Sequence, residues 1–308
     1  MLWGHVLPVE GDRSLIARRV EGAPLPTSCQ VSIVPEPMPP ATYHLDTVPV
    51  DGATRAPVLC LPGLFAGAWV FEGLLPLLAA RGYPASAMSY RGHPPLPPLA
   101  CIGRQSLTDF TADACAAARE LDRPIVIGHS LGGLVTQSMA ERNLIRAAIL
   151  VSPAPPRGIS VLSPPILARM ATYLPALLLS RAFLPSAAHL DALVLNCVPA
   201  AERAAVRGRF VADSGRAARE IALGAFKVQP QAVRAPMLVV GAEHDRFIPV
   251  GVSRRIAARY HAPFHVAAGH GHFLFAEPGW EREASVVLDW IDALPPSIRD
   301  VAHEMRHG

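Results

Sequence analysis

The chain has few charged residues and little excess of either sign. Asp, Glu, Lys and Arg together make up 17% of its 308 residues, and the formal net charge is +3. The arginines are scattered along the chain rather than gathered in one stretch. Proteins that bind nucleic acid usually concentrate basic residues on one patch. We therefore expect no nucleic-acid partner.

Cysteine is scarce, and its spacing suggests neither a disulfide framework nor a metal site. The five cysteines are an odd number, and no CxxC or Cys/His spacing typical of zinc ligands occurs. Reduced thiols in a cytoplasmic protein are the plain interpretation.

Long apolar runs are also missing. No stretch approaches the roughly 18 uninterrupted apolar residues of a membrane-spanning helix. The N-terminal residues are broken by Pro8, Glu10 and Asp12 where a signal peptide would have a continuous apolar segment. We expect no signal peptide, no integral membrane segment and a cytoplasmic location.

What the sequence does contain is a serine between glycines after a short apolar run. Residues 124–127 lead into Gly128-His129-Ser130-Leu131-Gly132. Such a run predicts a buried strand, then a tight turn into a helix. The pattern is that of a nucleophile elbow, in which the serine sits in strained backbone beside helix N–H groups that favour negative charge. The alternative is an ordinary strand-to-helix turn with a capping serine.

Apolar strand patterns alternate with helical patterns on both sides of this motif. Strands are predicted at 57–61, 85–90, 147–151, 237–241 and 264–267, and 42–50 is a candidate antiparallel strand. Helices are predicted between them, for example over 70–81 and 106–121. This alternation favours right-handed βαβ units and an α/β fold with a doubly wound, mostly parallel sheet.

Together, these motifs resemble the α/β-hydrolase family over about residues 58–290. They occur in the family's chain order: Leu61-Pro62-Gly63-Leu64-Phe65 after a strand, the Ser130 elbow, Asp245 after a later strand, and the histidine loop at 269–272. Arg91-Gly92-His93 resembles a structural corner of the family. The resemblance implies an α/β-hydrolase fold with an inserted all-helical cap.

A serine hydroxyl needs an imidazole base, and the imidazole needs a carboxylate. The resemblance assigns these roles to Ser130, His272 and Asp245. His270 is the second-choice base, because Gly271-His272 fits the family's spacing to Glu277-Pro278 better. The rival carboxylates are Glu243, Asp191 and Asp213.

The resemblance also assigns the oxyanion hole to the backbone N–H groups of Leu64 and Leu131. Pro62 stands where the family commonly has histidine. Because the donor is a backbone group and Gly63 is retained, this departure does not remove the chemistry. A plain glycine-containing turn is the alternative for this loop.

The expected organisation has four parts. Residues 1–40 are proline-rich and are predicted to form an extended arm on the main domain. The core comprises 41–151 and 236–295, the cap 152–235, and a polar, frayed tail 296–308. The cap is rich in Leu, Met, Phe and Tyr, so we expect a hinged apolar lid that lines the substrate pocket.

The predicted function is hydrolysis of a carboxylic ester, thioester or lactone through an acyl-enzyme. The substrate would be a small molecule with an apolar acyl group, and no metal or organic cofactor is implied. Two alternatives remain. The same triad could serve an acyltransferase, a cyclase or a C–C hydrolase, or the chain could be a ligand-binding protein on a hydrolase fold.

Overall fold

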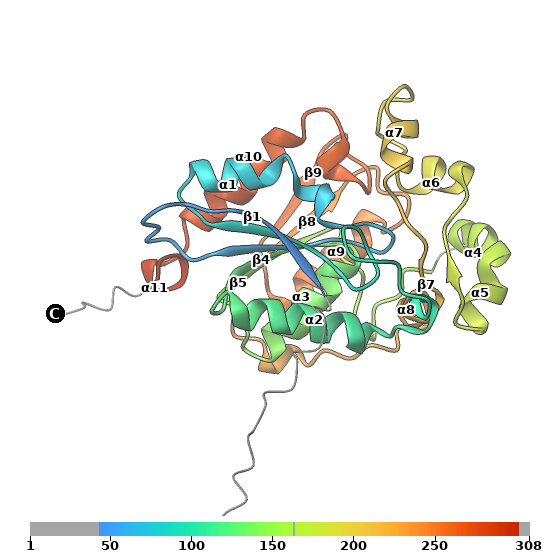
Figure 1. Ribbon diagram of the computed structural model, residues 1–308, viewed down its shortest axis with the longest axis horizontal. Coiled ribbons are helices and arrows are strands. Elements are labelled where there is room, and N and C mark those ends of the chain that lie inside the picture. The colour runs from blue at the N-terminus through green and yellow to red at the C-terminus, as the bar shows by residue number, and fades with distance from the viewer. Residues whose placement is uncertain (1–42, 163, 302–308) are drawn as a thin grey trace, which may run out of the picture. The chain divides into compact units, whose positions relative to one another are not determined.

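The computed structural model describes residues 43–162 and 164–301 (Figure 1). The predicted N-terminal arm and the last seven residues of the predicted tail lie outside the described residues. None of the described helices is long and apolar enough to cross a membrane.

The centre of the fold is one seven-stranded sheet in the order β1-β3-β2-β4-β5-β8-β9. β1 (His44–Val48) pairs antiparallel with β3, and all other pairs in this sheet are parallel. The remaining strands are β2 (Val58–Leu61), β3 (Ala85–Ser89), β4 (Ile125–His129), β5 (Ala147–Val151), β8 (Met237–Ala242) and β9 (Phe264–Ala267). β2, β3, β4, β5 and β8 are buried at every position, as expected of parallel strands covered on both faces. The predicted doubly wound sheet is confirmed.

Helices cover both faces of this sheet (Figure 1). The short 3-10 helix η1 (Ala68–Phe71), α1 (Leu74–Ala80) and α10 (Trp280–Asp292) pack on one face. α2 (Leu107–Glu120), α3 (Leu131–Glu141) and α9 (Val250–Tyr260) pack on the other. Each face therefore has its own apolar core.

The helix predicted over 70–81 is divided in two, into η1 and α1. Pro76 lies in the first turn of α1 and has no N–H for a carbonyl one turn earlier, so the α-helix cannot extend further toward the N-terminus. The helix predicted over 106–121 is present as α2. Ser106 caps it, and Asp109 completes a capping box.

The segment between β5 and β8 is mainly helical and lies beyond the carboxyl ends of the strands (Figure 1). The expected all-helical composition needs one correction, since β6 (Ala182–Phe183) and β7 (Asp213–Ser214) form an antiparallel pair. Two-residue strands are too short for alternation to appear in the sequence. The helices are α4 (Pro164–Met170), η3 (Ala171–Tyr173), α5 (Leu174–Leu178), α6 (Ala187–Leu193), α7 (Arg203–Arg207), α8 (Gly215–Ala222) and η4 (Pro230–Ala232).

The prediction of a frayed tail from residue 296 is wrong for its described part. Pro296 begins a short helix, α11 (Pro296–Arg299), at a position that suits proline. The Ala56 N–H donates to the carbonyl of Arg299 at 2.7 Å, and the Val301 N–H donates to Thr54 at 2.9 Å. The end of the described chain is thus paired with the segment that enters β2.

Candidate active site

Ser130 occupies the sharp turn between β4 and α3. Its backbone angles are φ 54° and ψ −116°, a region that side-chain-bearing residues rarely adopt. The turn depends on two neighbours without side chains. A Cβ on Gly132 would lie 2.2 Å from the Leu61 carbonyl oxygen, and one on Gly128 would lie 2.3 Å from Thr136 Oγ1. The predicted elbow is therefore present, with Ser130 at the carboxyl edge of the sheet.

A chain of hydrogen bonds joins Ser130 to an imidazole and a carboxylate. The distance from Ser130 Oγ to His272 Nε2 is 3.2 Å, and that from His272 Nδ1 to Asp245 Oδ2 is 2.8 Å. All three side chains are buried. Since the carboxylate can only accept, His272 donates from Nδ1, which leaves Nε2 to accept the serine proton.

The Asp245 carboxylate is held by the turn that follows β8. Its Oδ1 accepts from the N–H groups of Phe247 at 2.8 Å and Ile248 at 2.7 Å. Both oxygens are thereby engaged, and the ring of His272 has a fixed anionic partner.

The rival carboxylates contact other groups. Glu243 accepts from the Gly269 N–H at 2.9 Å. Asp191 pairs with Arg207 at 2.6 Å, on the outer helices of the insertion. Asp213 lies 3.1 Å from His93 Nε2. The structure brings only Asp245, among these four, to the imidazole of His272.

His270 lies beside Glu277 rather than beside Ser130. The distance from His270 Nδ1 to Glu277 Oε2 is 3.1 Å, and the same oxygen accepts from the Gly271 N–H at 2.7 Å. Burial raises the pKa of Glu277 above its ordinary value, although these two contacts oppose the shift. The pair supports the loop that carries His272.

His129, next to the candidate nucleophile, also holds this loop. Its Nε2 donates to the carbonyl oxygen of His272 at 2.8 Å. Burial, together with the electrostatic effect of the neighbouring His272 imidazole, lowers the pKa of His129 to about 3, so the ring of His129 is neutral. The sequence gives no sign that this side chain contacts the histidine loop.

The two predicted oxyanion donors come from two turns that meet at Ser130. Leu64 lies in the loop after β2, and Leu131 follows Ser130 in the turn after β4. A Cβ on Gly63 would lie 3.0 Å from Ser130 Cβ, so the backbone before Leu64 passes directly against the serine. The Leu131 N–H is the first of α3 and has no intrahelical acceptor. Within the described residues, neither the Leu64 nor the Leu131 N–H donates to another protein group. Both remain available to an anion.

Phe65 follows Leu64 in the loop after β2, and two hydrogen bonds join its backbone to the insertion. Its N–H donates to Asp213 Oδ2 at 2.8 Å, and its carbonyl accepts from the Val211 N–H at 2.9 Å. Its φ is 69°, in the left-handed region that a phenylalanine rarely adopts. Burial tends to lower the pKa of His93, but the charge and hydrogen bond of Asp213 outweigh burial and raise it. The sequence did not predict these contacts between Phe65 and the insertion, since Asp213 was considered only as a rival for the role of catalytic acid.

An apolar cavity of about 400 Å³ opens onto Ser130 and His272. Leu64 lines it from the loop after β2, and Phe247 from the loop after β8. The insertion supplies most of the remaining wall, including Ile166, Met170, Leu174, Leu177, Phe183 and Leu190. No cluster of three or more His, Cys, Asp or Glu side chains that could hold a metal ion occurs in residues 43–162 and 164–301.

The description of the matching family model is "Alpha/beta hydrolase family", and it matches residues 58–284. The chain belongs to this family. The predicted resemblance is thus confirmed, with the elbow, the acid strand and the histidine loop all inside the matched range.

Solved structures of low identity share the fold over most of the chain. A soluble variant of monoglyceride lipase from Saccharomyces cerevisiae is 17% identical with a TM-score of 0.68, and the match covers 88% of this chain and 98% of that one. The enol-lactonase from Burkholderia xenovorans LB400 is 19% identical with a TM-score of 0.64, over 81% and 96%. A monoacylglycerol lipase from Paleococcus ferrophilus is 20% identical with a TM-score of 0.62, over 80% and 97%. No curated protein matches the chain.

Proposed function

We propose that this α/β-hydrolase cleaves carboxylic esters of apolar acyl groups, with Ser130 as nucleophile, His272 as base and Asp245 as the acid that orients it. One observation carries the proposal: the hydrogen-bonded line from Asp245 through His272 to Ser130 ends at the apolar cavity. The esterase, lipase and lactonase names of similar structures support the same reaction class.

The first half of the reaction forms the acyl-enzyme. Ser130 Oγ attacks the ester carbonyl carbon while its proton passes to His272 Nε2, and Asp245 stabilises the imidazolium. The carbonyl oxygen becomes an oxyanion that the N–H groups of Leu64 and Leu131 would hold. The C–O bond to the alcohol then breaks, and the alcohol leaves with the proton from His272.

The second half releases the acid. Water gives a proton to His272 and attacks the acyl carbon, and the Ser130 ester breaks with return of that proton to the serine. The free carboxylic acid leaves, and the enzyme is restored. Atoms and charges balance without any metal or organic cofactor.

The cavity wall supports an apolar acyl group as substrate. Leu174, Leu177 and Phe183 offer no hydrogen bonds from their side chains, so affinity there must come from burial. Each fully buried methylene contributes about 0.8 kcal/mol. Longer acyl chains should therefore bind more favourably until the cavity is full.

A panel of p-nitrophenyl esters from acetyl to dodecanoyl tests both parts of the proposal. kcat/KM should rise severalfold for each two added carbons up to a medium chain, and Ser130→Ala should remove the activity. A fluorophosphonate probe should label the parent chain at Ser130. Equal turnover of acetyl and medium-chain esters would point to small or polar acyl groups instead. Failure to label Ser130 would favour a ligand-binding protein.

A further inference from the structure

Large exposed apolar side chains are concentrated on the insertion. Leu223, Leu178 and Leu179 are 72%, 61% and 58% exposed. Within the described residues, the one exposed large apolar residue outside the insertion is Val301, which is only 36% exposed. The exposed leucines, here called the leucine rim, are Leu162, Leu167, Leu174, Leu178, Leu179, Leu184 and Leu223.

The leucine rim surrounds the mouth of the active-site cavity. Five of its members also line the cavity, so the same side chains face both the interior and the solvent: Leu162, Leu167, Leu174, Leu178 and Leu223. Apolar groups gathered around an opening are uncommon on soluble monomers and mark interaction surfaces.

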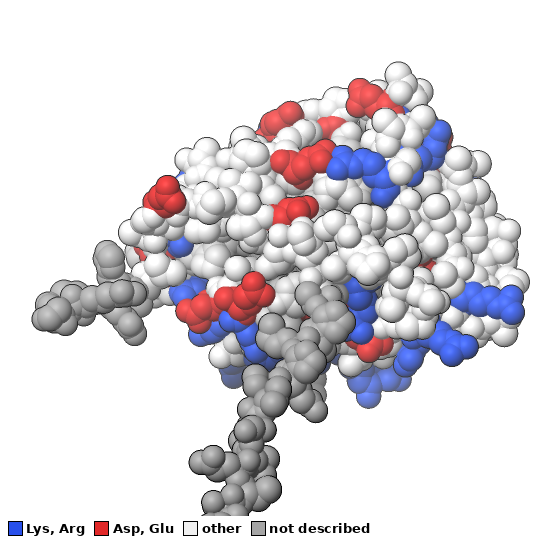
Figure 2. Space-filling view, viewed as in Figure 1, with Lys and Arg blue, Asp and Glu red and all other residues white. Residues whose placement is uncertain are grey.

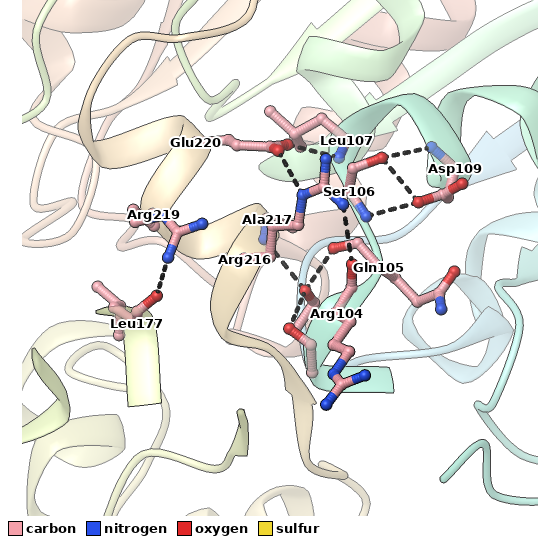
Figure 3. Close-up of polar contacts among 12 residues, drawn as sticks. Arg104, Gln105, Ser106, Leu107, Asp109, Leu177, Arg216, Ala217, Arg219 and Glu220 are labelled. Atoms are coloured by element: carbon pink, nitrogen blue, oxygen red, sulfur yellow. Dashed lines mark hydrogen bonds and ion pairs between the residues drawn. The ribbon is translucent and has the colours of Figure 1, made fainter. Parts of the chain in front are cut away.

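The part of the rim on α5 and α8 is fixed to the core. Arg219 Nη1 donates to the carbonyls of Leu177 at 2.6 Å and Leu178 at 2.8 Å, which end α5 (Figure 3). Glu220, the next residue on α8, accepts from the Leu107 N–H at 2.8 Å, at the start of α2 (Figure 3). Hydrogen bonds therefore join the helices that carry these exposed leucines to each other and to α2 of the core.

Basic residues outnumber acidic ones in the insertion that carries this surface. Residues 152–235 contain ten Arg and Lys and four Asp and Glu, although the whole chain has a net charge of only +3. Two of the acids pair with arginines, Asp191 with Arg207 and Glu220 with Arg216. Figure 2 shows basic side chains beside and below the end of the molecule that carries α5 and α8.

Arg181 is a basic residue close in sequence to two leucines of the rim, Leu179 and Leu184. It lies three residues after the end of α5 and is exposed. Among the described residues, its side chain has no ion-pair partner. The Gly215 N–H donates to its carbonyl at 3.1 Å, which fixes its backbone against α8.

We propose that the leucine rim and Arg181 dock this protein on an anionic lipid surface. Leucines would enter the boundary between headgroups and acyl chains, while the guanidinium would meet lipid phosphates. A protein partner or a second copy seated here would close the cavity mouth. A lipid surface would cover the leucines and also deliver apolar esters to that mouth.

The inference goes beyond ester hydrolysis, and its test does not depend on turnover. Full-length Ser130→Ala is sedimented with vesicles of phosphatidylcholine alone or mixed equally with phosphatidylglycerol. Binding to the mixed vesicles should be about tenfold tighter and should weaken with salt. In the same background, Leu178→Ser/Leu179→Ser/Leu223→Ser should weaken binding to mixed vesicles at least about tenfold.

Two matched controls separate docking from general effects. Val301→Ser removes an exposed apolar side chain far from the rim and should bind like the parent. Arg181→Glu should weaken binding to mixed vesicles severalfold, whereas Arg119→Glu, at the end of α2, should not. Thermal unfolding of each variant shows whether it is folded.

Three results would overturn the proposal. Protein that stays in the supernatant with both kinds of vesicle has no lipid affinity. A folded triple-leucine variant that binds like the parent means that the rim is not the contact. A dimer in lipid-free solution that the triple variant loses would identify a second copy of the chain as the occupant.

Discussion

Asp213 of the insertion accepts a hydrogen bond from the backbone N–H of Phe65 at 2.8 Å. The carboxylate is 1% exposed and also contacts His93 Nε2 at 3.1 Å and the Ser214 N–H at 2.7 Å. Phe65 directly follows Leu64, whose N–H is the proposed oxyanion donor. The insertion therefore helps to fix the loop that faces the reacting carbonyl, and this end of it is anchored rather than hinged.

Asp213→Asn should reduce kcat for a good ester by about 10- to 100-fold with little change in KM. Three N–H groups point at this carboxylate, and an amide would turn its own NH₂ toward one of them. The Phe65 backbone, with its unfavourable φ, would then relax and move the oxyanion donor, which acts mainly in the transition state. Steady-state kinetics on a medium-chain ester measures the effect.

Asp191→Asn is the control for that variant. Asp191 is also a carboxylate of the insertion, but its partner is Arg207 on the outer helices. We expect nearly unchanged kcat. A folded Asp213→Asn protein whose KM rises while kcat stays constant would instead assign Asp213 to substrate binding.

Ser130→Ala should keep the fold and lower turnover by roughly 10⁴-fold or more. His272→Ala should cause a similar loss, and the double variant should be little worse than either single one, because triad members act as a unit. Initial rates with circular dichroism on all three variants test this. Multiplying losses in the double variant would show that the two residues act independently.

His270→Ala should be much milder than His272→Ala. His270 contacts Glu277, and its loss would loosen the loop without removing the base. Ester hydrolysis rates of the two variants at neutral pH give the ranking. A reversed ranking would make His270 the base and would mean that the 3.2 Å contact between His272 and Ser130 is not the productive one.

The sheet and the elbow could be predicted because their signals are local. A buried parallel strand is a short apolar run, and the elbow needs glycines at fixed positions, as Gly128 and Gly132 show by their contacts with Thr136 and Leu61. The order of Ser130, Asp245 and His272 along the chain matches that of the α/β-hydrolase family, and this order identified the acid and the base of the triad. Each follows a strand, and parallel strands bring their carboxyl ends to one edge.

Contacts between distant segments could not be predicted in this way. Phe65 and Asp213 are 148 positions apart, and neither residue type marks the other. The local sequence also could not decide between His270 and His272. The two residues lie in the same loop, and they differ in the direction in which their side chains point. Only the packed loop decides which imidazole faces Ser130.

His129 should make the protein less stable as pH falls. Its pKa is depressed from 6.5 to about 3 in the folded chain, so between these values the unfolded state takes up a proton that the folded state refuses. The stability is fully present above pH 6.5 and declines toward pH 3, by about 1.4 kcal/mol per pH unit from this group. Urea unfolding from pH 7 to pH 4 measures the slope.

His129→Gln keeps a donor for the His272 carbonyl but cannot titrate, so its stability should depend less steeply on pH, by up to that amount. Parallel slopes for the two proteins would show that His129 is protonated in the folded chain or is not a source of the acid sensitivity.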